Sequence, residues 1–79
     1  MPPVTQPVPV EGEIRLGQFL KLAGAADSGA DARTLLLEGE VTVNGEAEAR
    51  RGRRLVAGDL VRVDLVDGPL TYRVEPPPA

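Results

Sequence analysis

Four apolar residues in the first third of the chain recur at positions i, i+3, i+4 and i+7, the spacing that forms one buried face of a helix. They are Leu16, Phe19, Leu20 and Ala23. The pattern predicts a helix over residues 15–23. Helical geometry would align three polar residues on its opposite face, where they could contact an anion. These are Arg15, Gln18 and Lys21.

A second helix is predicted from its end signals. Ser28 is followed three residues later by Asp31, a pattern typical of a helix N-cap with an acid in the first turn. The helix would run to about Glu38 and end at Gly39, which tolerates the left-handed backbone of a helix stop. Its core face would be formed by Ala32, Leu35 and Leu36.

The second half of the chain has the pattern of strands. Residues 41–43 alternate between apolar and polar side chains, as in a strand with one buried face. Asn44-Gly45 is a typical hairpin turn that leads into a polar return strand. Further strands are predicted over residues 60–65 and 70–74, with Tyr72 packing on the sheet rather than stacking on a base. The fold class is therefore α+β, with two short helices packed on a small, mostly antiparallel sheet.

Prolines dominate both ends of the 79-residue chain. Because proline lacks an amide donor, we expect residues 1–12 and 75–79 to be disordered tails around a single domain at residues 13–74. A proline-rich end is also a possible ligand for an aromatic-lined groove, but no PxxP repeat with flanking basic residues occurs.

Composition excludes several kinds of site. The chain has no cysteine and no histidine, so it lacks thiolate ligands, imidazole ligands and the usual bases of hydrolases. Its acids have no nucleophile or phosphate-binding loop beside them. We therefore expect no enzyme activity, no cofactor and no metal. No signal peptide or membrane-spanning run is visible in the sequence, so we expect a cytoplasmic monomer.

The net charge of −3 opposes polyanion binding, but four arginines fall within residues 50–54. Screening confines exposed charges to about 8 Å, so a local basic cluster can act despite acids elsewhere. Guanidinium groups match phosphate oxygens and stack on unpaired bases. Alternatively, Glu46 and Glu48 pair with these arginines and form a solvated edge. The composition of the cluster leaves both interpretations open.

Several segments in order resemble the S4-type RNA-binding domain, or alpha-L motif, and most closely its small stand-alone bacterial members, the YaaA and YbcJ group. The segments are LGQFLKLA at residues 16–23, Ser28-Gly29, GEVTVNG at residues 39–45, and RRGRRL at residues 50–55 followed by Gly58-Asp59. The resemblance covers residues 14–64. Many domains of this superfamily have a basic residue directly after the serine, where this chain has Gly29.

The resemblance implies a non-catalytic protein that binds structured RNA, with ribosomal and transfer RNA as candidates, through backbone phosphates and shape. Matched position by position, it implies a set of RNA-facing residues. These are Arg15, Lys21, Ser28, Arg33, Arg50, Arg51, Arg53 and Arg54. The alternative is a protein-interaction module of ubiquitin-like or small α+β type. A ubiquitin-like carrier would need a terminal Gly-Gly for activation, whereas this sequence ends PPPA, so carrier chemistry is not expected. Docking of a partner protein through an edge strand remains the alternative.

Overall fold

The computed structural model describes residues 5–77, which form two helices and seven strands. The helices are α1 (Leu16–Leu22) and α2 (Gly29–Leu37). The strands are β1 (Thr5–Pro9), β2 (Ile14–Arg15), β3 (Val41–Val43), β4 (Glu46–Ala47), β5 (Arg54–Leu55), β6 (Leu60–Leu65) and β7 (Gly68–Glu75).

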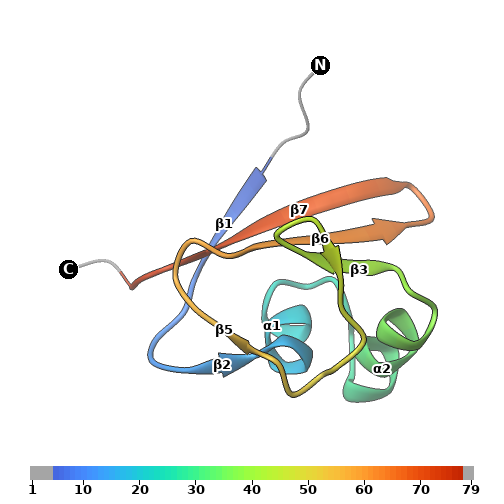
Figure 1. The fold of residues 1–79 in the computed structure, drawn as a ribbon, viewed down its shortest axis with the longest axis horizontal. Coiled ribbons are helices and arrows are strands. Elements are labelled where there is room, and N and C mark those ends of the chain that lie inside the picture. Colours follow the sequence, from blue (N-terminus) through green and yellow to red (C-terminus); the bar gives the residue numbers. More distant parts are fainter. Residues whose placement is uncertain (1–4, 78–79) are drawn as a thin grey trace.

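Five strands form one sheet in the order β1-β7-β6-β3-β4, in which only the β1–β7 pair is parallel. Both helices lie on the same side of this sheet (Figure 1). The short strands β2 and β5 pair separately, beside the start of α1. This arrangement confirms the expected α+β fold with two helices on a mostly antiparallel sheet.

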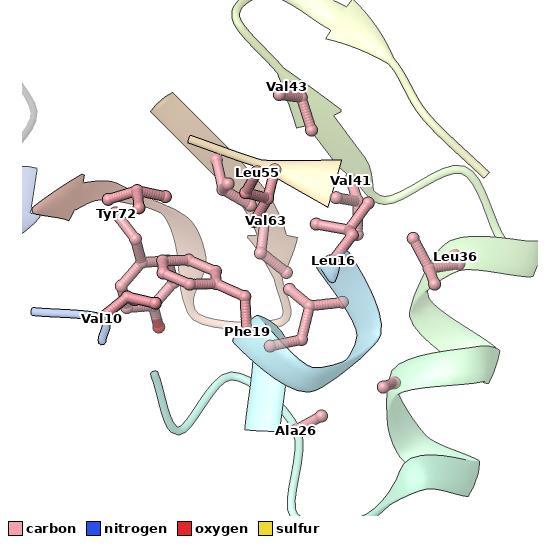
Figure 2. Packing of buried hydrophobic residues seen from close by; sticks show 14 residues of the cluster. Val10, Leu16, Phe19, Ala26, Leu36, Val41, Val43, Leu55, Val63 and Tyr72 are labelled. Atoms are coloured by element: carbon pink, nitrogen blue, oxygen red, sulfur yellow. The ribbon is translucent and has the colours of Figure 1, made fainter. Parts of the chain in front are cut away.

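The core lies between the sheet and the helices (Figure 2). Because strand side chains alternate, the buried residues of β3, β6 and β7 share one face, and Val43, Val61 and Tyr72 form one cross-strand row. Phe19 of α1 meets Tyr72 edge to face, with ring centroids 6.3 Å apart and an interplanar angle of 81°. The prediction that Tyr72 packs on the sheet is confirmed.

The helix ends follow the sequence signals closely. The Ser28 hydroxyl accepts a hydrogen bond from the Asp31 amide at 3.2 Å, and α2 begins at Gly29. Gly39 has φ +73°, the left-handed conformation expected after the helix. Helix α1 is shorter than predicted by one residue at each end, since Arg15 and Ala23 are its caps.

The side chain of Asn44 in the predicted hairpin turn also forms hydrogen bonds to a second turn. Asn44 and Gly45 have φ +53° and +85°, as a two-residue hairpin loop requires. The Asn44 amide group donates to the Asp59 carboxylate at 3.0 Å, and its oxygen accepts from the Leu60 amide at 2.9 Å. Asn44 thereby joins the β3–β4 turn to the turn that precedes β6.

The expected disorder of residues 1–12 is wrong for β1, which pairs with β7 from Thr5↔Thr71 to Pro9↔Glu75. The Val10 amide donates to the Glu75 carbonyl at 2.9 Å, and amides of alternate residues face the same side of a strand. Pro7 and Pro9 therefore occupy positions whose missing amides would face away from β7, where an edge strand tolerates proline. Val10, from the same expected tail, is buried in the core, and Glu75, from the expected C-terminal tail, ends β7. Residues 1–4 and 78–79 lie outside the described residues.

Candidate nucleic-acid interface

A hollow of about 280 Å³ opens between α1, the start of α2 and the arginine segment of residues 50–54. Four of the eight predicted RNA-facing residues line it: Arg15, Lys21, Arg33 and Arg51. The other lining residues are Gly17, Gln18, Gly29, Ala32 and Gly52. The polar stripe predicted on α1 thus forms one wall of the hollow, and no acidic residue lines it.

The remaining four predicted residues lie outside this lining. Ser28 caps α2. Arg54 pairs with Glu13 at 3.2 Å in an exposed contact. Arg50 and Arg53 both bind Glu48, at 3.2 Å and 3.1 Å. The predicted pairing with Glu48 is therefore confirmed for Arg50 and Arg53. Glu46 forms no ion pair within residues 5–77, Arg54 pairs with Glu13 instead, and Arg51 lines the hollow.

Ion pairing divides the nine basic residues of the chain into two groups. Five arginines form ion pairs with acids within residues 5–77: Arg50, Arg53, Arg54, Arg62 and Arg73. None of the ion pairs in this part of the chain involves the four cations that line the hollow. The four cations of the hollow therefore have no carboxylate at ion-pair distance within residues 5–77, although the whole chain is acidic.

The arginine segment is hydrogen-bonded to the start of α1 through its backbone carbonyl groups. The amides of Leu16 and Gly17 donate to the carbonyls of Arg53 and Arg51, at 2.8 Å and 2.9 Å. The Arg15 guanidinium donates to the Gly52 carbonyl at 2.7 Å. These first helical amides have no partner within the helix itself, so the arginine segment satisfies them and is fixed over the hollow.

Glu48 holds the same segment from its other side. Besides its ion pairs with the two arginine side chains, the Glu48 carboxylate accepts hydrogen bonds from the backbone amides of Ala49 and Arg50, at 3.1 Å and 3.3 Å. The hydrogen bond from the Arg50 side chain is the main reason that the pKa of Glu48 lies below its usual value. Arg53 also approaches Asp59 at 3.6 Å, which connects the segment to the turn before β6.

The hollow suits phosphate groups better than stacked bases. The two aromatic residues of the chain, Phe19 and Tyr72, are both buried in the core, so neither offers a stacking platform. Guanidinium groups remain available to bind phosphate oxygens in pairs or to lie against an unpaired base. Contacts would thus depend on charge and shape.

The predicted set of RNA-facing residues did not include Gly17, Gly29 or Gly52, which bring backbone to the walls of the hollow. A glycine in the first turn of a predicted helix, as at position 17, was an available signal, because glycine is a poor helix former and its presence favours a close approach. Residues 5–77 contain no group of three or more acids that would suit a metal ion. Neither helix in this range is long and apolar enough to cross a bilayer.

The fold and the hollow together define a small α+β domain with a cationic surface between two helices and an arginine segment. A family model for the S4 domain matches residues 9–73, and the chain belongs to this family. The match begins four residues before the domain boundary expected at residue 13 and includes the end of β1.

Three relatives illustrate the similarity. The chain is 47% identical over 62 residues to the probable ribosome maturation protein RlbA of Bacillus subtilis (strain 168), covering 77% of this chain and 87% of that protein. It is 42% identical over 48 residues to YbcJ of Escherichia coli (strain K12), covering 61% and 69%. It is 48% identical over 52 residues to the small ribosomal subunit protein uS4m of Schizosaccharomyces pombe (strain 972 / ATCC 24843), covering 66% of this chain and 16% of that protein. The resemblance to small S4-type proteins is confirmed.

Proposed function

We propose that this protein binds structured RNA through the cationic hollow and performs no catalysis. The observation that carries the proposal is the division of the basic residues. The four cations in the hollow have no acidic partner within residues 5–77, whereas the five arginines elsewhere each have one. Clustered cations without acidic partners are what a phosphate backbone requires.

The RNA we propose to test first is ribosomal RNA, with transfer RNA as the comparison. The names of two relatives refer to ribosome maturation and to the small ribosomal subunit. Within the predicted set, Arg15, Lys21, Arg33 and Arg51 would contact phosphates directly. Arg50 and Arg54 would extend the surface at its exposed rim, and Ser28 would act through the position of α2.

Salt dependence provides the first test of this proposal. If about four to six phosphates are neutralised, the logarithm of the binding constant should fall with the logarithm of salt concentration at a slope of roughly −3 to −5. Fluorescence anisotropy with labelled ribosomal RNA fragments and with transfer RNA, at several salt concentrations, measures this slope. A slope near zero would contradict phosphate binding.

A variant with Arg15, Lys21, Arg33 and Arg51 replaced by alanine should lose RNA binding while remaining folded. A matched control replaces Arg62 and Arg73, which lie on β6 and β7 at positions that alternate with the buried residues. The control removes positive charge from the opposite face of the sheet and should retain most of the affinity. The hollow variant removes four positive charges and the control removes two, so the losses are compared per charge removed. An equal loss per charge in both variants would mean that only net charge matters and that the hollow is not the site.

A further inference from the structure

The arginine segment presents Arg51 to the hollow while two of its other arginines face a single carboxylate. Glu48 accepts hydrogen bonds from the Arg50 side chain and from two backbone amides, and it forms an ion pair with Arg53. Only 13% of its side chain is exposed, compared with 79% for Arg50. The carboxylate therefore lies inside the turn that the segment makes and bonds to several points along it.

This carboxylate is connected to the wall of the hollow by a short chain of contacts. Arg53 binds Glu48 through its side chain, and its carbonyl accepts from the amide of Leu16 in α1. Two residues earlier, the Arg51 carbonyl accepts from Gly17. A change at Glu48 would consequently reach the backbone that carries Arg51.

We propose that Glu48 is a positioning residue for RNA binding: it holds the arginine segment in the conformation that places Arg51 in the hollow. This inference rests on the proposed function. It also assigns different roles to the arginines of the cluster, because Arg53 serves the internal network and Arg51 the ligand.

The proposal can be separated from a simple charge effect because the two predict opposite signs. Glu48→Gln removes a negative charge near the site and releases two guanidinium groups, so electrostatics alone predicts tighter RNA binding. If Glu48 positions the segment, the same substitution weakens binding. A less ordered Arg51 would make its phosphate contact only part of the time, and the salt slope would become shallower by up to about 1.

Glu46→Gln is the matched control. Glu46 belongs to the same hairpin and carries the same charge, but none of the ion pairs or side-chain hydrogen bonds in residues 5–77 involves it. We expect its RNA affinity to equal or slightly exceed that of the parent protein. Weakening by Glu48→Gln but not by Glu46→Gln would support positioning, and tighter binding by both would overturn it.

Two further measurements test the route through Arg51. In an Arg51→Ala background, Glu48→Gln should have much less effect on affinity, since coupled residues are not additive. In the absence of RNA, amide hydrogen exchange at Leu16 and Gly17 should accelerate in Glu48→Gln, because both amides bond to the segment. Unchanged exchange in a folded variant, or fully additive losses, would overturn the role of Glu48. If the parent protein bound no RNA, the proposed function would fail, and the positioning role in binding with it.

Discussion

Gly17 and Arg51 form a close backbone contact between α1 and the arginine segment. The Gly17 amide donates to the Arg51 carbonyl at 2.9 Å. A Cβ atom at position 17 would lie 3.2 Å from the Cβ of Arg51, which is tighter than an ordinary van der Waals contact. The absence of a side chain at position 17 therefore allows the segment to sit against the helix and to close the hollow.

Gly17→Ala should weaken RNA binding without unfolding the protein. The added methyl group would push the segment outward by a few tenths of an ångström, which displaces Arg51 from the other cations. We expect affinity to fall by up to about tenfold, equivalent to about 1.4 kcal/mol. The helix propensity of alanine would offset part of the strain by at most about 1 kcal/mol. Anisotropy titration and urea denaturation measure the two effects.

Gly29→Ala is the control for this substitution, because position 29 lines the same hollow and a Cβ there has no neighbouring atom within 4 Å. It should leave RNA affinity unchanged and raise stability slightly. Equal affinity losses at positions 17 and 29 would show that the close contact with Arg51 is not the cause.

The elements that the sequence predicted well depend on neighbouring residues. The apolar spacing of α1, the Ser28 cap and the Asn44-Gly45 turn each involve residues at most a few positions apart. Strand β1 was missed because its partner β7 lies near the other end of the chain. Proline lacks an amide donor, but its effect on a strand depends on which side of the strand is paired.

The candidate site shows the same limit. The polar stripe on α1 correctly anticipated one wall of the hollow, because helical periodicity fixes which residues share a face. The sequence alone could not show which arginines of the cluster form ion pairs and which line the hollow, because four arginines in five positions are equivalent in composition. Only the path of the backbone determines that Glu48 faces Arg50 and Arg53 while Arg51 faces the hollow.

Gly29→Lys should strengthen RNA binding. Position 29 lines the hollow, has open space around it and stands at the first residue of α2. A lysine there would add a fifth cation and one phosphate contact, which should make the salt slope steeper by about 0.7–0.9. Gly29→Gln is the neutral control of similar length. Binding by Gly29→Lys no tighter than that by Gly29→Gln would mean that this corner of the hollow does not face phosphate.

Substitutions of Asn44 should separate its hydrogen bonds from its backbone conformation. Asn44→Gly keeps the left-handed φ of +53° accessible but removes the bonds to Asp59 and Leu60, so we expect a loss of about 1–2 kcal/mol. Asn44→Ala should cost about 1–2 kcal/mol more, because alanine is strained at this φ. Urea denaturation of both variants measures the difference. Equal stability of the two variants would contradict the strain argument.

Tyr72 should make stability depend on pH in the alkaline range. Burial against Phe19 raises the pKa of the Tyr72 hydroxyl, because the ionised form is poorly solvated in the core. The folded state therefore favours the neutral form more strongly than the unfolded state does, whose tyrosine has a pKa of about 10. This contribution to stability is fully present at pH values below the unfolded-state pKa, and it is lost as the pH rises through the higher pKa of the folded state.

Tyr72→Phe removes the titrating group while keeping the ring on the core face. Between about pH 8 and about pH 11, the free energy of unfolding should fall more steeply for the parent protein than for Tyr72→Phe. The other titrating groups are common to both proteins and cancel in the difference. Because Tyr72 is the sole tyrosine of the chain, tyrosinate absorbance of the folded protein reports its titration directly. Parallel pH profiles for the two proteins, or titration at the pKa of a free tyrosine, would show that Tyr72 is not held neutral by the core.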